Sequence, residues 1–243
     1  MLLKVIDFET CGLAPPAGVC EVGWVDVVQL PESTQWAAHP PISTLVNPGQ
    51  SIPPESSAVH GITDADVDGA PSFHDVIARM LKEPMLALAG HNIKFELKWL
   101  PPNVPDDFQL IDTYAIALRL APQAPSHSLQ ALRYWLKLDV GPSGEPKHRA
   151  GPDSYTTAKL LIRMLAKLPV EKLIAISSEP ILLPRINFGK HKSKPFSALP
   201  LDYLDWLLSQ SDMDADVLYA AKHELERRAT EATTTAIAKD STT

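Results

Sequence analysis

Two carboxylates stand on an apolar segment at the start of the chain, and they constrain its fold more than any other feature. Residues 2–7 are mostly apolar and predict a buried strand. Asp7 and Glu9 are two positions apart, and side chains at i and i+2 of a strand point to the same face. Two such carboxylates can hold hard cations such as Mg²⁺ or Mn²⁺, which prefer oxygen ligands. We therefore expect a metal site that further carboxylates complete from elsewhere in the fold.

Two later motifs supply the remaining groups. Glu96 lies in the sequence HNIKFE, and Asp153 follows His148 by five residues, as in a loop that enters a helix. Two metals about 3.5–4 Å apart activate a water and stabilise the leaving oxygen of a phosphodiester. An imidazole, with a pKa near ~6.5, can accept the water proton at neutral pH. Each motif alone is more typical of a strand edge, an exposed helix residue or a capped helix start, but their joint occurrence indicates a nuclease.

Length and charge limit the possible partners. The 243 residues suit one catalytic domain of about 170 residues with a small additional module. The formal net charge of −7 argues against a globally basic nucleic-acid binder. Contacts to nucleic acid must then come from bound metal and from local basic patches. The densest such patch contains Lys190, Lys192 and Lys194.

The sequence also carries no sign of a membrane or secreted protein. It has no run of about 18 apolar residues, and its N-terminus lacks the features of a signal peptide. Cys11 and Cys20 are the only cysteines, so they form neither a disulfide framework nor a four-cysteine zinc site. We expect a cytoplasmic protein.

The order of the apolar segments predicts an α/β fold. Strands come first and then alternate with helices, which is typical of a mixed sheet flanked by helices. Asp112, at a strand-to-helix junction, is expected to be an N-cap. The five expected strands cover residues 2–7, 21–30, 36–46, 85–89 and 109–111. Proline content and a Thr, Ala and Ser-rich end predict a catalytic domain at 1–168, a linker at 169–185, a small module at 186–230 and a disordered tail at 231–243.

Taken together, the motifs resemble one known family. VIDFETCGL, HNIKFE and HRAGPD match, in this order, the motifs of DEDDh-type 3′→5′ exonucleases of the DnaQ group, which have a ribonuclease H-like fold. A histidine five positions before the last aspartate is typical of the h subtype, whereas the y subtype has tyrosine at the position of Arg149. The stretches at 21–23 and 59–63 are also common in the group. The resemblance covers about residues 1–168, and the C-terminal module resembles that of exonuclease-X-like proteins.

The resemblance implies a metal-dependent enzyme that hydrolyses DNA at 3′ ends and releases 5′-mononucleotides, with two Mg²⁺ or Mn²⁺ ions per site. It implies that one metal is held by Asp7, Glu9 and Asp153, and that Asp7 bridges to the second. His148 would be the general base. Glu96, the fourth catalytic and metal-binding carboxylate, stands where the family has aspartate. The expected nucleic-acid contacts are Cys11, Gly12, Leu13, His60, Asn92, Lys190, Lys192 and Lys194.

Several roles stay open on the sequence alone. The motifs contact phosphate, metal and water, so they do not separate a DNA exonuclease from an RNA-trimming exonuclease of the same fold. The longer side chain of Glu96 can bind metal or weaken the site. A catalytically weakened nucleic-acid-binding or polymerase-associated subunit is therefore a third alternative. Leu13 and His60 fit either nucleotide contacts or ordinary packing. Tyr203 and Trp206 favour core packing over base stacking.

Overall fold

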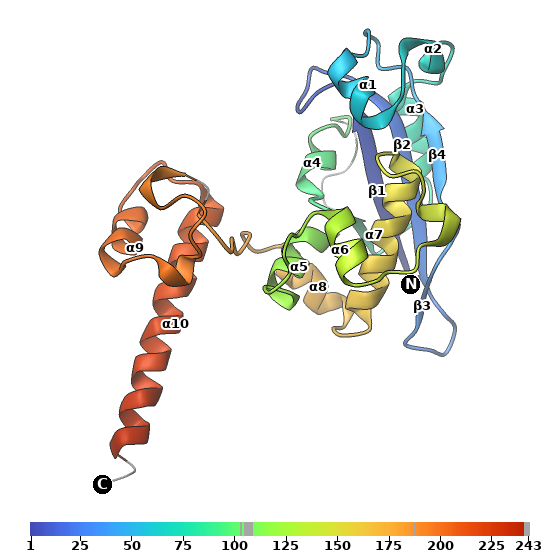
Figure 1. Ribbon diagram of the computed structural model, residues 1–243. Helices are drawn as coiled ribbons and strands as arrows, with labels where there is room; N and C mark the ends of the chain where they lie inside the picture. Colours follow the sequence, from blue (N-terminus) through green and yellow to red (C-terminus); the bar gives the residue numbers. More distant parts are fainter. Residues whose placement is uncertain (103, 105–108, 187, 241–243) are drawn as a thin grey trace. The chain divides into compact units, whose positions relative to one another are not determined.

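The computed structural model describes residues 1–102, 104, 109–186 and 188–240, with side chains described as far as Glu231. The chain forms two compact units. The first comprises Met1–Ile116 and Gln123–Ser178, and the second comprises Ala117–Pro122 and Glu179–Thr243. Figure 1 shows the elements of each unit.

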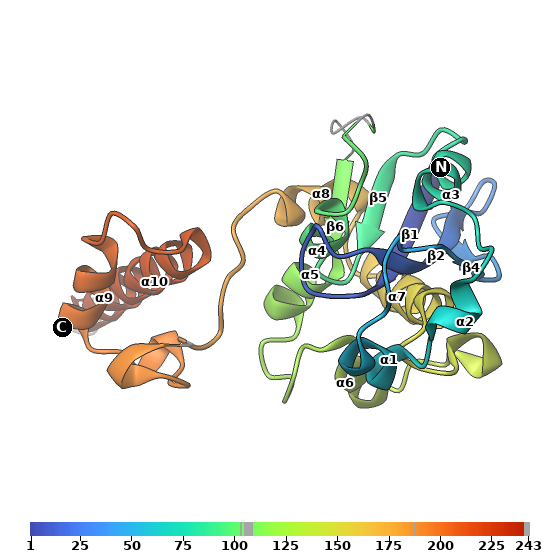
Figure 2. The ribbon, with the colours of Figure 1, turned by 90° about the horizontal axis from the view of Figure 1, so that it is seen from above.

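A mixed six-stranded sheet forms the centre of the first unit, which confirms the predicted α/β class. The strands are Leu2–Thr10 (β1), Val19–Gln29 (β2), Trp36–Ala38 (β3), Ile42–Leu45 (β4), Ala87–Gly90 (β5) and Gln109–Asp112 (β6). The long strands β1 and β2 pair antiparallel, and β5 and β6 continue in parallel from β1. The order across the sheet is β3-β2-β1-β5-β6, with β4 also paired to β2. Figure 2 shows this sheet from above.

The expected number of five strands is corrected to six. The sequence predicts one strand over residues 36–46, but β3 ends at Ala38 and β4 begins at Ile42. Pro40 and Pro41 lie between them, and proline lacks the N–H that a sheet ladder requires. β3 and β4 consequently pair with opposite ends of β2.

Short helices fill the connections of the first unit, and polar side chains cap two of them. The Ser72 hydroxyl accepts the N–H of Asp75 over 3.1 Å at the start of Phe73–Met80 (α3). Asp112 accepts the N–H of Tyr114 over 2.9 Å, so it is an N-cap as predicted. The helix that Asp112 caps is Thr113–Leu120 (α5). The other helices before the active-site helix are Pro54–His60 (α1), Asp64–Val67 (α2), Lys94–Leu97 (α4), Leu129–Trp135 (α6) and the 3₁₀ turn Gly141–Gly144 (η1).

The two long strands divide their side chains between two faces of the sheet, because successive residues alternate. Ile6 and Phe8 of β1 belong to an apolar core that includes Met80 of α3. Asp7 and Glu9 therefore point to the other face. The helix Ala150–Leu165 (α7) packs across β1 and β2 (Figure 1).

The first unit extends further along the chain than the sequence predicts. Residues 170–177 lie in the predicted linker, but they form the helix Val170–Ser177 (α8), which packs against β6. Pro169 is the N-cap of this helix. Proline is well suited to helix starts because its φ is fixed and its missing N–H is not needed there. Pro169, which the sequence suggests as part of a linker, thus begins a helix. The first unit ends at Ser178.

The second unit is a small helical module. Its elements are the 3₁₀ turns Gly189–His191 (η2) and Phe196–Ala198 (η3) and the helices Leu201–Leu208 (α9) and Ala215–Asp240 (α10). Its core contains Ile186, Leu204 and Leu207. α10 runs through Asp240, into the tail predicted to be disordered, and residues 241–243 lie outside the described residues. Neither α10 nor any other described helix is apolar enough to cross a membrane.

Candidate active site

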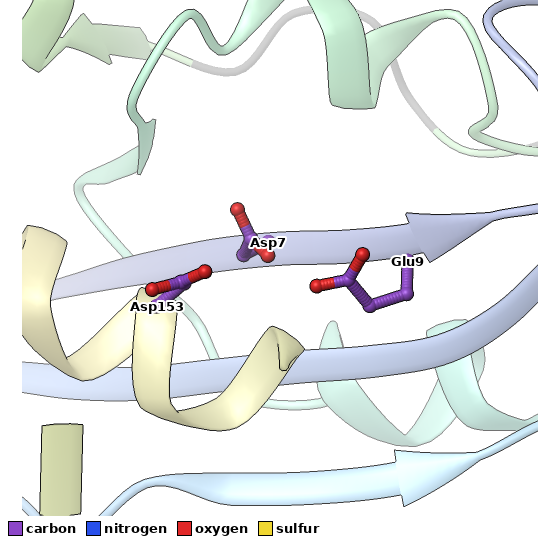
Figure 3. Close-up of side chains that lie close together, drawn as sticks. All are labelled: Asp7, Glu9 and Asp153. Atoms are coloured by element: carbon purple, nitrogen blue, oxygen red, sulfur yellow. The ribbon is translucent and has the colours of Figure 1, made fainter. Parts of the chain in front are cut away.

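Three carboxylates from two elements meet in the first unit. Asp7 and Glu9 project from β1, and Asp153 projects from the first turn of α7 (Figure 3). One oxygen of each lies within 4.8 Å of an oxygen of the other two. Asp153 is buried, whereas the other two are half-buried. In the part of the chain that the structure describes, no other group of three His, Cys, Asp or Glu side chains is arranged to hold a metal.

A close approach of two backbones brings these carboxylates together. Gly23 of β2 is the cross-strand partner of Asp7. A Cβ atom at Gly23 would lie 2.0 Å from the carbonyl carbon of Ala150, where α7 begins. Only glycine permits such an approach between a strand and another backbone. Gly23, within the EVG stretch of the sequence, therefore allows Asp153 to reach Asp7.

Glu96 brings a fourth carboxylate from α4. It is only 4% exposed, and its Oε2 atom is buried without a hydrogen-bond partner. Burial raises the pKa of Asp7 well above its ordinary value, and among the neighbouring charges Glu96 raises it most. Glu96 thus lies beside the three-carboxylate group, although outside its 4.8 Å limit. A buried, unpaired carboxylate oxygen of this kind is costly unless a cation or donor meets it.

The electrostatics of the group fit a divalent cation. Burial, followed by the charges of Asp153 and Glu21, raises the pKa of Glu9 to about 8. Burial also raises the pKa values of Glu96 and Asp153. Without a cation, the carboxyl groups favour their protonated form, because burial disfavours the charged form and their negative charges repel one another. A set of oxygen donors with this repulsion suits a hard divalent ion.

Two hydrogen bonds orient Asp153. Gln130 of α6 donates from Nε2 to Oδ1 over 2.6 Å, and the backbone N–H of His148 donates to Oδ2 over 2.9 Å. Both carboxylate oxygens are therefore held. Gln130 cannot be identified from the sequence, because it lies on a short helix with no motif around it.

His148, the predicted general base, lies in the loop before α7 with an exposed side chain. Its φ angle of 58° is left-handed, a conformation that costs a non-glycine residue about 1–2 kcal/mol. The backbone bond to Asp153 holds it there. The chain thus fixes the backbone of His148 to a candidate metal ligand and leaves the imidazole open to solvent.

An ion pair to a buried carboxylate anchors the start of α7, and the motifs alone assign it no role. Arg149 donates from Nε and Nη2 to the two oxygens of Glu21, over 2.9 and 2.7 Å. Glu21 also accepts the N–H of Ala150 over 2.9 Å and the hydroxyl of Ser43 over 2.6 Å. This carboxylate therefore joins β2, β4 and α7. Its signals in the sequence are the EVG stretch and the arginine at the tyrosine position of the y subtype.

The predicted nucleotide contacts differ in accessibility. In the loop after β1, Cys11 is buried and Leu13 is 85% exposed. The carbonyl of Gly12 accepts the hydroxyl of Thr10 over 2.6 Å. Asn92 is exposed at the start of the α4 segment. The loop therefore presents Leu13 to solvent four residues after Glu9.

His60 is engaged inside the protein. Its Nδ1 accepts the N–H of Ile62 over 3.0 Å, and its Nε2 lies 3.7 Å from Sγ of Cys20. These contacts favour the packing role over a direct nucleotide contact. Lys190, Lys192 and Lys194 are exposed and belong to the second unit.

Comparison with known proteins decides the family. The family model described as Exonuclease matches residues 5–161, a span that includes the four carboxylates and His148. The chain belongs to the exonuclease family. It is therefore a nuclease, as the sequence predicts, and exonucleases of this DEDDh type depend on divalent metal ions.

Relatives of this exonuclease cover both parts of the chain. Exodeoxyribonuclease 10 of Escherichia coli is 34% identical over 232 residues, which cover 93% of this chain and 99% of the relative. A DNA polymerase III subunit epsilon-like protein of Rhodobacter capsulatus is 34% identical over 70% of this chain and 24% of its own length. The solved structure of Exonuclease X in complex with 5′ overhanging duplex DNA has a TM-score of 0.62 and 34% identity, covering 72% of this chain and 99% of that one. These similarities confirm the predicted resemblance and the ribonuclease H-like fold.

Proposed function

We propose that this exonuclease removes 5′-mononucleotides from the 3′ ends of DNA, with two Mg²⁺ or Mn²⁺ ions at its site. The group of three carboxylates within 4.8 Å, with Glu96 beside it, carries the proposal. The similarity to an exodeoxyribonuclease and to a DNA complex of Exonuclease X supports DNA as the substrate.

The carboxylates take different places in this proposal. Asp7, Glu9 and Asp153 would hold one ion, and Asp7 would share the second with Glu96. When bound, the ions supply Lewis acidity to the attacking water and the leaving oxygen. The chain itself supplies orientation, because Gln130 and the backbone of His148 fix Asp153. Such preorganisation lowers the barrier since nothing has to reorient during the reaction.

His148 would accept the proton of the attacking water. Its imidazole is exposed, so it can pass the proton on to solvent. The contact between its backbone and Asp153 keeps it at the metal site.

The loop after β1 would border the 3′-terminal nucleotide through Cys11, Gly12 and Leu13, with Asn92 nearby. Leu13 is the accessible apolar group of this loop, and apolar side chains can pack against or separate bases. His60 would shape the loop region through Cys20 rather than contact the nucleotide. The second unit would contribute phosphate contacts from Lys190, Lys192 and Lys194.

A nuclease assay tests this proposal directly. Single-stranded and duplex DNA and single-stranded RNA of one sequence, each with a 5′ label, are incubated with Mg²⁺, with Mn²⁺ or with a chelator. We expect a ladder that shortens from the 3′ end of DNA, with 5′-mononucleotides as products. Asp7→Ala should lower the rate by about 10²-fold or more, whereas Asp139→Ala, which removes an exposed carboxylate of the same unit, should not.

Three outcomes contradict the proposal. Faster degradation of RNA than of DNA would make the chain an RNA-trimming exonuclease. Binding without turnover in every metal would make it the weakened subunit that the Glu96 departure leaves open. Near-normal turnover of a folded Asp7→Ala protein would remove the metal site.

A further inference from the structure

The second unit contains a cleft beside Lys190, and the proposed function gives no role to its other lining residues. It has a volume of about 480 Å³ and is lined by Phe188, Gly189, Lys190, Asp202, Tyr203 and Trp206. This volume lies within the range of roughly 300–1,000 Å³ that is typical of small-molecule sites. The cleft lies between the turn η2 and the helix α9.

An aromatic pair forms one wall of this cleft. The rings of Tyr203 and Trp206 are stacked, with centroids 5.2 Å apart and an interplanar angle of 27°. Tyr203 is buried in the core of the unit, whereas Trp206 remains 45% exposed. The expectation that both residues serve core packing therefore holds for Tyr203 and not for Trp206. The indole keeps open surface on which another flat ring can stack.

Positive charge borders the same cleft. The Nζ atom of Lys190 lies 5.4 Å from the centroid of the Tyr203 ring, so the ammonium group is held beside the aromatic wall. Residues 180–201 contain Arg185, Lys190, Lys192 and Lys194 and no Asp or Glu. This local excess opposes the net charge of −7 of the whole chain. Asp202 is the acidic residue of the lining, and its carboxylate can accept a hydrogen bond from the amino group of a base.

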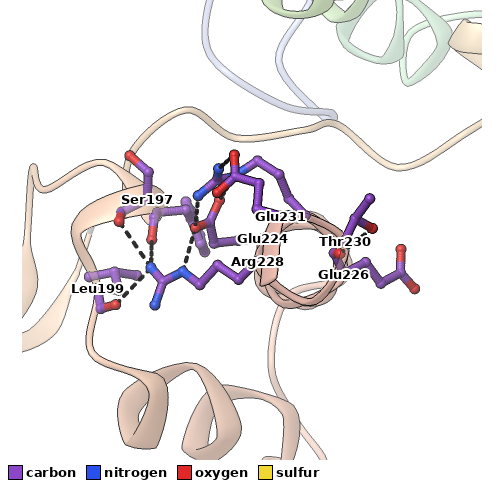
Figure 4. A network of polar contacts seen from close by, with 9 residues as sticks. Ser197, Leu199, Glu224, Glu226, Arg228, Thr230 and Glu231 are labelled. Carbon is purple, nitrogen blue, oxygen red and sulfur yellow. Dashed lines mark hydrogen bonds and ion pairs between the residues drawn. The ribbon is translucent and has the colours of Figure 1, made fainter. Parts of the chain in front are cut away.

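The walls of the cleft are fixed by the rest of the unit. Arg228 of α10 donates from Nη2 to the carbonyls of Ser197 and Leu199, both over 2.9 Å, and from Nε to Glu224 over 2.6 Å (Figure 4). These bonds attach the segment before α9 to α10. Gly189 has a left-handed φ of 66°, and a Cβ atom there would lie 3.0 Å from the hydroxyl of Tyr203. Glycine at this position keeps the cleft open.

We propose that this cleft binds single-stranded nucleic acid, with an unpaired base stacked on Trp206 and a neighbouring phosphate beside Lys190. Stacking on a side chain requires a base that is free of its own helix, so the cleft would select single strands over duplex. The chemistry is that of general single-strand binding, in which aromatic platforms combine with basic side chains. The inference rests on the proposed function in that the bound strand is the substrate of the first unit.

Binding can be measured without turnover in the full-length Asp7→Asn protein. The probe is a fluorescein-labelled oligothymidylate of 12 nucleotides, followed by anisotropy, with a duplex of equal length for comparison. Trp206→Ala should weaken binding of the single strand by at least about 5-fold, from the loss of one stacked base, and Trp206→Phe should retain most of it. Leu208→Ala, on the same helix and 39% exposed but outside the cleft, is the matched control.

The charge component has its own measurement. Lys190→Gln should reduce the slope of log K against log salt concentration by about 0.7, the value for one phosphate contact on a single strand. Lys222→Gln, which removes an exposed lysine of α10, should leave the slope unchanged. In the background with native Asp7, Trp206→Ala should raise KM and leave kcat unchanged, because Trp206 would hold an unpaired base of the strand and not the phosphate that is cut.

The outcomes separate this inference from the proposed function. Loss of metal-dependent hydrolysis in the native chain would overturn the proposed function and leave the binding assay interpretable. Equal affinities of Trp206→Ala, Trp206→Phe and Leu208→Ala would overturn the cleft. An oligoglutamate that binds as tightly as the oligothymidylate would overturn its assignment to nucleic acid. If the Trp206→Ala protein fails to fold, the affinity of Trp206→Phe and the salt dependence of Lys190→Gln still test the cleft.

Discussion

The substitution Gly23→Ala tests how the backbone positions the candidate metal ligands. The added Cβ atom would lie 2.0 Å from the carbonyl carbon and 2.1 Å from the oxygen of Ala150, and Cβ atoms do not approach other heavy atoms within 3.0 Å. The start of α7, and Asp153 with it, must therefore retreat by at least about 1 Å. A displacement of this size at a reacting centre costs about 10²-fold in rate. We expect kcat to fall by about that factor and the midpoint for Mg²⁺ activation to rise.

The assay combines turnover with metal binding. kcat is measured at saturating 5′-labelled DNA, and Mn²⁺ affinity is measured by calorimetry, which does not depend on turnover. Overpacking should also cost about 1–3 kcal/mol in the free energy of unfolding. Val27→Ala, which shortens a buried residue of the same strand four positions after Gly23, provides a control for stability loss alone. If Gly23→Ala folds and retains the kcat and metal affinity of Val27→Ala, the argument that Gly23 sets the position of Asp153 is wrong.

Three further predictions concern individual side chains of the site. If His148 accepts the water proton, His148→Ala should flatten the rising limb of the pH–rate profile; an unchanged limb would assign the step to another group. Glu96→Gln should raise the Mg²⁺ concentration needed for half-maximal rate, because it removes a charge from the second ion; a metal titration identical to that of the native chain would show that Glu96 is not a ligand. In metal-free protein, stability should fall as pH rises from about 4.5 to about 8, since the pKa of Glu9 is raised to about 8 and the folded state keeps a proton that the unfolded chain releases. Thermal unfolding in the presence of a chelator measures this slope, and a flat profile over that window would contradict it.

The elements that the sequence predicts well are those with local signals. β1 shows a continuous apolar segment, and Ser72 and Asp112 occupy positions where short polar side chains cap helices. The segments that the sequence predicts wrongly contain prolines. Proline is common both in linkers and at helix starts, so its presence does not distinguish the two. Pro169 begins α8, whereas Pro40 interrupts a segment that otherwise has the composition of a strand.

The residues of the candidate site divide in the same way. Asp7 and Asp153 lie in motifs whose order along the chain is informative, and the structure brings their carboxylates together. Gln130 has no such signal, because its role arises only from the packing of α6 beside α7. The exposure of Trp206 is likewise a tertiary property, since the spacing from Tyr203 is equally consistent with two buried rings.

The composition of the site from distant segments has a consequence for biosynthesis. β1 leaves the ribosome early with Asp7 and Glu9, while Asp153 belongs to α7, which is among the last elements of the first unit to be made. Glu21 likewise cannot anchor that helix until Arg149 has been synthesised. Domains fold largely as units during synthesis, so a nascent or truncated chain lacks a complete set of ligands. A nuclease assembled in this way becomes able to cut only after almost all of its catalytic unit exists.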